Sequence, residues 1–152
     1  MCVLLLVDVE GVSRVDDVRA VSWDYPMLYA QTQIETTLDT NAAIRGLRAA
    51  GATQIIVADG HGARVRPTEF NLLPEELESG VELVRGASYL ETAEEFDALA
   101  MVGMHCRNGT PVGFMGHTTS GFTAVRFNGE WFGEVGRCWP PSPGRRACPR
   151  SS

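Results

Sequence analysis

The sequence contains no lysine, and its 13 basic residues, all of them arginine, are outnumbered by 19 acids. The formal net charge of the 152 residues is therefore -6 at pH 7, with an isoelectric point near 5.0. Nucleic acids and anionic lipid surfaces attract basic patches through their phosphates. The charge thus argues against both as the main partner of this protein.

Long apolar runs are also missing, because no stretch approaches the roughly 20 residues that cross a bilayer. The apolar N-terminus is only about six residues long, lacks a basic leader and runs into acids, so it predicts a strand and not a signal peptide. The few cysteines form neither a C-x-x-C pair nor a dense framework, which favours a reducing compartment. We expect a soluble, cytoplasmic protein without a membrane partner; its cysteines are Cys2, Cys106, Cys138 and Cys148.

A strand, a helix and a second strand follow one another at the start of the chain. Residues 2–9 form a continuous apolar run, typical of a strand buried on both faces of a parallel sheet. Pro26 and Gly51 suit the first turn and the end of a helix between them. The stretch TQIIVADGHG, residues 53–62, predicts a second, parallel strand whose carboxyl end shares an edge with the first. The apolar stripe of the helix comprises Ile34, Leu38, Ala42, Ala43 and Leu47.

The remaining apolar runs complete an α/β fold. Residues 81–86 and 98–105 predict two further strands. Asn128-Gly129 between two aromatic and β-branched runs predicts a β-hairpin with a two-residue turn. We therefore expect a mainly parallel sheet flanked by helices, with the hairpin at its C-terminal side.

The composition changes abruptly after about residue 135. The stretch GRCWPPSPGRRACPRSS is rich in proline and arginine and contains no acid, which predicts a disordered tail over residues 137–152. A second interpretation is a shift of the reading frame. When the sequence from Arg137 onward is back-translated with G/C-ending codons and read two bases later, the resulting peptide has the pattern of a small-residue helix followed by the start of a strand. Under either interpretation, residues 1–136 are expected to form one metal-binding α/β domain.

Two carboxylates, Asp8 and Glu10, end the first apolar run in the stretch VDVEGVS, residues 7–13. In a strand, residues i and i+2 project from one face, so the two carboxylates should converge. Unpaired, they repel each other and lose solvation, and a divalent cation removes both penalties. The alternative is a solvated strand end. The parallel sheet favours the cation, because ligands bind outside the carboxyl ends of its strands.

His61 and His105 follow the neighbouring strands and are candidate nitrogen ligands. The hairpin supplies Glu134, whose alternative is an exposed strand residue. Together with Asp8 and Glu10 they form an oxygen and nitrogen set that suits Zn²⁺, with Mn²⁺ or Co²⁺ as alternatives. Five ligands exceed the needs of one tetrahedral zinc. We expect two metals that share a bridging carboxylate and activate a water for attack on an amide or ester.

His117 lies in the glycine-rich stretch GFMGHTTSG. A neutral imidazole there can carry a proton or stabilise an oxyanion, which makes His117 the candidate catalytic residue. The alternative is a hairpin-edge histidine bonded to Thr118 or Ser120. Asp59, two residues before His61, is a candidate hydrogen-bond acceptor for a ligating imidazole, or else a cap of the following turn.

Four motifs in order give a resemblance to a known family. VDVEGVS, ADGHG, VGMHCRNGTPVGFMGHT and NGEWFGEVG resemble the successive motifs of the zinc-dependent D-aminopeptidases of the DppA type. The resemblance implies a two-zinc site that removes N-terminal D-amino acids from short peptides or amides through a metal-bridging hydroxide. It implies that Asp8 bridges both zinc ions, that Glu10 and His61 complete one site and His105 and Glu134 the other, and that His117 is catalytic.

The resemblance also implies an assembly, because members of this family form homo-oligomeric rings whose sites face an internal chamber. Family chains are longer and continue past the glutamate, so we expect that the C-terminal part of the fold is lost here. Other interpretations stay open: a catalytically inactive truncated remnant, a peptide-binding accessory of dipeptide uptake, or a different two-metal amidase or esterase.

Overall fold

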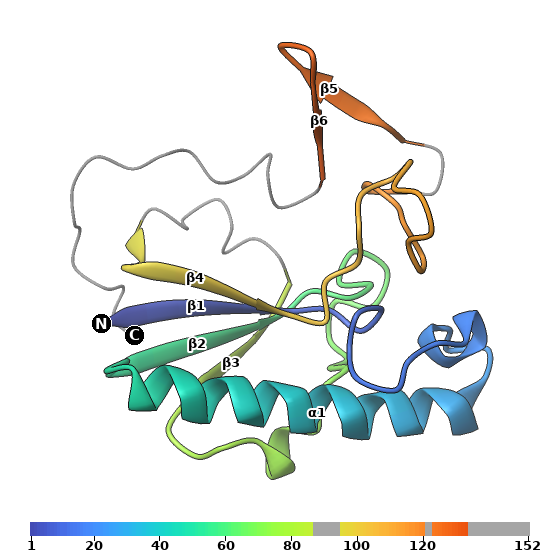
Figure 1. The fold of residues 1–152 in the computed structure, drawn as a ribbon. Helices are drawn as coiled ribbons and strands as arrows, with labels where there is room; N and C mark the ends of the chain where they lie inside the picture. Colours follow the sequence, from blue (N-terminus) through green and yellow to red (C-terminus); the bar gives the residue numbers. More distant parts are fainter. Residues whose placement is uncertain (87–94, 121–122, 134–152) are drawn as a thin grey trace.

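A four-stranded sheet with a long helix against it forms the body of the molecule (Figure 1). The computed structural model describes residues 1–86, 95–120 and 123–133. The strands are β1 (Cys2–Val7), β2 (Gln54–Asp59), β3 (Glu82–Arg85) and β4 (Ala98–Val102). They lie in the order β3-β2-β1-β4, and all neighbours in this sheet are parallel. The α/β fold expected from the sequence is confirmed.

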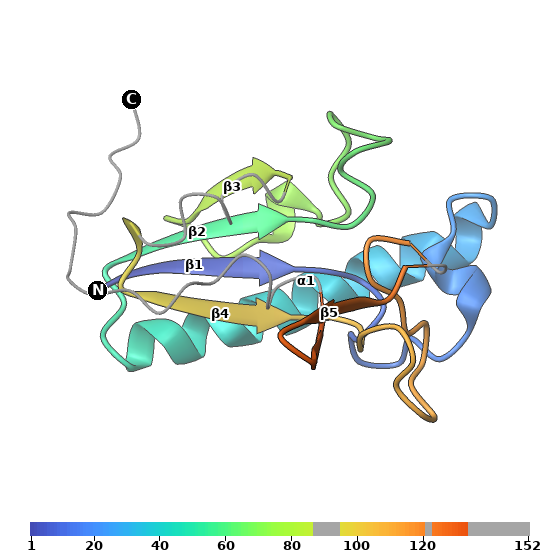
Figure 2. The same ribbon diagram turned by 90° about the horizontal axis from the view of Figure 1, so that it is seen from above.

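Helix α1 (Pro26–Ala49) connects β1 to β2 and lies along one face of the sheet (Figures 1 and 2). The predicted strand-helix-strand unit is therefore confirmed. In the parallel pair, Val7 at the end of β1 lies opposite Asp59 at the end of β2. Gly51 has a φ of +95°, a conformation that favours glycine, and it ends the helix where the sequence predicts.

β1 lies where the order of the strands reverses. The chain continues from β1 to β2 and β3 on one side and then places β4 on the other side. In open α/β sheets, ligands bind in the crevice outside the carboxyl ends of the strands at such a point. Figure 2 shows the arrowheads of β1, β2 and β4 pointing toward the same edge. The loops that follow these three strands therefore meet there.

Apolar side chains cover both faces of the sheet, and β1 is buried along its full length. Because alternate residues of a strand point to opposite faces, β1 contributes to two separate clusters. Leu5 packs in one cluster with Ile44 of α1, and Leu4 and Leu6 pack in the other with Phe96. This double burial explains the unbroken apolar run of the first strand.

The buried face of α1 matches the predicted stripe only in part, because Ala43 and Leu47 pack against the core whereas two other members do not. Ile34 and Leu38 are 46% and 54% exposed. Threonines fill the buried face, and their hydroxyls donate to carbonyls one turn earlier, as Thr36 Oγ1 does to Thr32 O at 2.7 Å. A threonine bonded in this way buries its methyl group without an unpaired donor. The buried threonines are Thr32, Thr36, Thr37 and Thr40.

The hairpin is confirmed as β5 (Val125–Phe127) and β6 (Glu130–Phe132), an antiparallel pair with a two-residue turn. Asn128 and Gly129 have φ values of 50° and 87°, the positive values that such turns require. The predictions for Glu134 and for the tail of residues 137–152 lie outside the described residues. Within the described residues, no helix is both long and apolar enough to cross a membrane.

Candidate metal centre

Asp8 and Glu10 lie in the turn that follows β1. The strand ends before Asp8, so the expected alternation along a strand is wrong as the reason for their convergence. Backbone hydrogen bonds hold the turn against the end of β4, from Asp8 N to Val102 O at 2.9 Å and from Gly11 N to Gly103 O at 2.8 Å. The turn, and not the pleat of the strand, brings the two carboxylates together.

Two glycines let this turn and the loop after β4 approach each other closely. A Cβ on Gly103, which has a φ of +68°, would lie 2.0 Å from the carbonyl oxygen of Asp8. A Cβ on Gly11 would lie 2.4 Å from the carbonyl oxygen of Met104. Both contacts are with backbone atoms, so no side-chain rotation could relieve them. The glycines therefore set the approach of Asp8 to the loop that carries His105.

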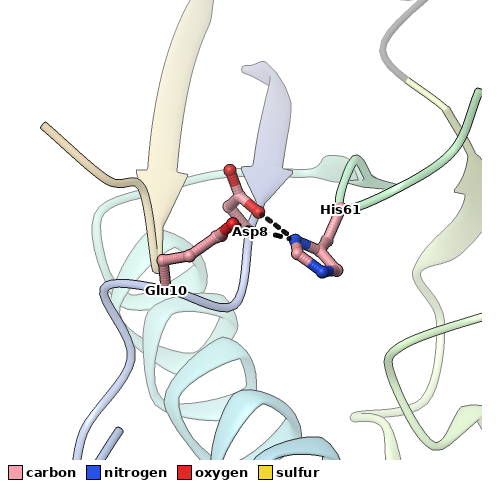
Figure 3. Close-up of side chains that lie close together, drawn as sticks. All are labelled: Asp8, Glu10 and His61. Carbon is pink, nitrogen blue, oxygen red and sulfur yellow. Dashed lines mark hydrogen bonds and ion pairs between the residues drawn. The ribbon is translucent and has the colours of Figure 1, made fainter. Parts of the chain in front are cut away.

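His61 completes a cluster with the two carboxylates (Figure 3). It lies two residues after β2, and its Nδ1 is 3.2 Å from Asp8 Oδ1 and 3.2 Å from Glu10 Oε1. One potential ligand atom of each residue lies within 4.8 Å of the other two. No side chain of the three is more than 13% exposed. The parallel pairing of β1 with β2 brings these two strand ends together.

The second carboxylate oxygen of Glu10 indicates what the cluster is suited to hold. Within the described part of the chain, Glu10 Oε2 is buried without a hydrogen-bond partner. A buried carboxylate oxygen without a donor is costly, and a divalent cation would satisfy it. Two carboxylates and an imidazole also offer the oxygen and nitrogen donors that zinc accepts in proteins. The residues present therefore fit a zinc ion.

His105 approaches the same aspartate from the loop after β4. Its Nε2 lies 3.7 Å from Asp8 Oδ2. Its Nδ1 lies 2.9 Å from the carbonyl oxygen of Cys106, and because a carbonyl can only accept, Nδ1 carries a proton; in the neutral ring Nε2 then presents a lone pair. The two oxygens of Asp8 therefore face different histidines, Oδ1 facing His61 and Oδ2 facing His105.

His117 stacks on His105, with ring centroids 3.5 Å apart and planes 15° from parallel. Its Nδ1 lies 2.7 Å from the carbonyl oxygen of Met115, and its backbone N–H donates to the carbonyl oxygen of Cys106 at 3.1 Å. The carbonyl of Met115 thus holds the imidazole, and the carbonyl of Cys106 holds the backbone of the same residue. With the proton on Nδ1, Nε2 is the atom that can accept a proton.

Asp59, the last residue of β2, is buried. Its carboxylate accepts from Asn71 N at 2.6 Å and forms an ion pair with Arg85 Nη1 at 2.9 Å. The sequence suggested that Asp59 accepts from a ligating imidazole. The side-chain contacts of Asp59 instead include Asn71 and Arg85, which both donate to the backbone carbonyl of His61.

Burial and mutual contact shift the pKa values of all three clustered residues. Burial raises the pKa of Asp8 to about 6, and the neighbouring Glu10 adds to this rise. Burial also acts upward on Glu10, but its hydrogen bonds with His61 and Asp8 hold its pKa below the ordinary value. Burial alone would lower the pKa of His61, yet its bonds to the two acids raise it to about 10. The metal-free cluster therefore keeps a proton on His61 at neutral pH, which a cation must displace.

Sequence reasoning missed three residues around His61: Trp23, Asn71 and Arg85. The rings of Trp23 and His61 have centroids 5.5 Å apart. Gly62 packs so closely under the indole that a Cβ there would lie 2.2 Å from Trp23 Cη2. The second glycine of ADGHG, Gly62, was the one available signal for these neighbours. A glycine marks a close approach of another group, but it does not identify that group.

Comparisons with known proteins identify the family and support the fold. A family model described as D-aminopeptidase matches residues 1–137. The solved structure of the Zn-dependent D-aminopeptidase DppA from Bacillus subtilis, described as a self-compartmentalizing protease, is similar with a TM-score of 0.72 and 26% sequence identity. The match covers 88% of this chain and 48% of that chain, so the present chain spans about half the length of that protein. No curated protein matches. Because the family model covers most of its length, the chain belongs to the D-aminopeptidase family.

Proposed function

We propose that this chain is a dinuclear zinc aminopeptidase that removes N-terminal D-amino acids from short peptides or amides. The observation that carries the proposal is the carboxylate of Asp8, with Oδ1 3.2 Å from His61 Nδ1 and Oδ2 3.7 Å from His105 Nε2. Such a carboxylate would be able to hold two cations, one through each oxygen and each beside its own imidazole. Membership of the D-aminopeptidase family supports the class of reaction.

The ligands divide between two zinc sites that share Asp8. Glu10 and His61 complete the first site, supported by the 3.2 Å separation of Glu10 Oε1 and His61 Nδ1. His105 and Glu134 complete the second, where Glu134, outside the described residues, is assigned from its position just after the hairpin. Zinc is preferred because the similar Bacillus subtilis enzyme is Zn-dependent. Mn²⁺ and Co²⁺ accept the same mixed donors and are the alternatives.

Zinc ions held here would polarise the scissile carbonyl and lower the pKa of the attacking water. His117 is the residue that moves the proton: with a proton on its Nδ1, bonded to Met115 O, a neutral imidazole accepts a further proton at Nε2 and can return it to the leaving amine. Stacking on His105 fixes the plane of this ring beside the ligands. The carboxylates of Asp8 and Glu10 are buried, so little of their surface is open to bulk water.

We also infer that the protein acts as a homo-oligomer in the cytoplasm. The self-compartmentalizing character of the similar enzyme supports the assembly, and the sparse cysteines support the compartment. Cys106 is a free thiol in the structure. Thiol labelling under denaturing conditions, applied to protein taken from its native cells, tests the location, since we expect every cysteine to react. A cysteine that reacts only after reduction would contradict a reducing compartment, and light scattering tests the assembly.

The reaction is tested by metal analysis of the purified chain together with hydrolysis of a D-alanyl amide. We expect two zinc ions per chain and release of D-alanine, with the L-alanyl amide as the matched control substrate. Bound zinc without turnover would identify a remnant or a peptide-binding accessory. Hydrolysis of other amides or esters, with the D-alanyl amide untouched, would identify a different two-metal hydrolase.

A further inference from the structure

A buried ion pair adjoins the loop that carries His61, and the proposed chemistry does not use it. Asp59 ends β2 and Arg85 ends β3, and the two residues lie opposite each other in the parallel register. Their side chains are 1% and 6% exposed, with Arg85 Nη1 2.9 Å from Asp59 Oδ1. Asn71 donates to the same oxygen at 2.5 Å. A buried ion pair is weak grounds for stability, so the other contacts of these donors decide what the group does.

The other donors converge on one atom, the backbone carbonyl oxygen of His61. Arg85 Nη2 lies 2.5 Å from it and Asn71 Nδ2 lies 2.9 Å from it. Arg85 Nε donates to the carbonyl oxygen of Arg66 at 3.1 Å, which ties the guanidinium to the same loop. Tyr29 donates its hydroxyl hydrogen to Asn71 Oδ1 and thereby fixes which end of the amide faces His61.

Trp23 holds the same loop through its indole ring. The ring lies over Gly62, and its centroid is 5.5 Å from that of the His61 imidazole. The guanidinium carbon of Arg66 lies 5.0 Å from the indole centroid, so Trp23 is itself held in place. The residue His61 is therefore fixed both at its backbone, by buried donors, and at its ring, by an aromatic contact.

Fixing a peptide carbonyl also restrains the direction in which the side chain of the same residue leaves the backbone. The carbonyl group of His61 is joined to its Cα atom, so two hydrogen bonds to the oxygen restrict ψ and the direction of the Cα–Cβ bond, while the contact with Trp23 restrains the ring itself. Ligating histidines are commonly oriented through their second ring nitrogen. At His61, Asn71 and Arg85 donate to the backbone carbonyl.

We propose that Asn71 and Arg85 are positioning residues for zinc binding, which aim His61 at the metal through its backbone carbonyl while Asp59 holds both donors. The inference rests on the proposed zinc site and goes beyond it, because neither residue is a ligand. Loss of a contact that orients a metal ligand typically lowers metal affinity about 10- to 100-fold. We expect Asn71→Leu and Arg85→Met to fall in this range.

The experiment measures zinc affinity by competition with a chromogenic chelator, and the absorption spectrum of the Co²⁺-substituted protein reports ligand geometry. Arg85→Met leaves Asp59 buried without its cation, which lowers stability. The double variant Asp59→Asn/Arg85→Met removes both charges, so the melting temperature of its metal-free form should recover. Its zinc affinity should stay low and its cobalt spectrum should stay altered, because the bond from Arg85 to His61 O is still missing.

Arg48 offers a matched control, because it too contacts a carboxylate, Glu78, and a backbone carbonyl, that of Ser79. It lies in the last turn of α1, which precedes the start of β2, whereas His61 follows the opposite end of that strand. Arg48→Met should leave zinc affinity and the cobalt spectrum unchanged. A loss in Arg48→Met equal to that in Arg85→Met would overturn the positioning role, since the effect would then be one of general stability.

Failure of the inference and failure of the proposed function give different results. A wild-type chain that binds neither Zn²⁺ nor Co²⁺ removes the metal site, and with it both ideas. A wild-type chain that binds zinc, with the same affinity in Asn71→Leu and in the double variant, leaves the enzyme proposal intact and overturns the positioning role.

Discussion

The two halves of the metal centre are built differently, although they share Asp8. The half around His61 is enclosed by buried side chains from several elements, among them Asp59 of β2 and Arg85 of β3. The half around His105 and its stacked neighbour His117 is held by its own loop. His105 bonds the carbonyl of the next residue, and His117 bonds the carbonyl two residues before it. Tertiary contacts fix the first half, whereas local turns shape the second.

Backbone conformation shows the same contrast. In the loop after β4, the non-glycine residues Val112, Met115 and Thr119 have φ values of 59°, 49° and 64°. Such conformations cost on the order of 1–3 kcal/mol each, and they persist only where their surroundings hold them. The His61 half is thus preorganised for a cation by its packing, while the second half stores strain near its ligand.

Asp8→Ala should have the largest effect, because it removes the side chain that both halves share. Without a carboxylate between the two histidines, we expect no retained zinc and no measurable hydrolysis of the D-alanyl amide. Elemental analysis and the amide assay measure both. Asp16→Ala is the matched control, since Asp16 is an exposed acid further along the same connection. One zinc retained tightly by Asp8→Ala would show that the two halves bind independently.

His117→Ala changes only the half around His105, because His117 lies in that loop. It is not a proposed ligand, so the change should affect catalysis and not metal binding. We expect turnover to fall about 10²- to 10⁴-fold, the usual contribution of a general acid or base. Zinc content should equal that of the wild type. Full turnover with full zinc would exclude His117 as the group that moves the proton.

Gly103→Ala tests the contact between the halves. A Cβ there would lie 2.0 Å from the carbonyl oxygen of Asp8, at a φ of +68°, so we expect a loss of about 3 kcal/mol or more in the free energy of unfolding. Gly46→Ala is the control, because nothing lies within 4 Å of a Cβ at that position in α1. That change should stabilise the protein by about 0.5–1 kcal/mol. Urea denaturation of both metal-free variants measures the difference, and equal stabilities would contradict the close approach.

The half of the centre built on strand ends could be predicted from the sequence. The apolar runs at residues 2–9 and 53–62, with a helix between them, specify a parallel pair. That pairing is what brings Asp8 and His61 to one edge of the sheet. The nearness of Glu10 was expected from strand alternation, but the residue lies in a turn, and the turn places it beside Asp8.

The contacts that orient the ligands could not be predicted. Asn71 and Arg85 bind the carbonyl oxygen of His61 from 10 and 24 positions away, and no pattern marks a side chain that bonds a distant backbone atom. Helix α1 shows a related limit. The apolar Leu38 is exposed while Thr36 is buried, because the threonine hydroxyl is satisfied within the helix itself.

The pH dependence of zinc binding should be the smallest of these effects, corresponding to the release of about one proton on binding. It tests the protonation of His61 in the metal-free protein. In the folded, metal-free protein the pKa of His61 is raised from 6.5 to about 10. Its pairing with the two acids therefore stabilises the fold fully below pH 6.5, and this stabilisation is lost as the pH rises through about 10. The pKa of Asp8, about 6, leaves that carboxylate mostly ionised above neutral pH.

Zinc binds the neutral imidazole, so binding at about pH 7.5 should release about one proton from His61. Affinity should then rise up to about tenfold for each pH unit until the pKa of His61 is reached. Calorimetric titration in two buffers with different ionisation enthalpies counts the protons released. If none is released, His61 is already neutral without zinc, and the ion pairs that hold it to Asp8 and Glu10 in the metal-free protein do not form in solution.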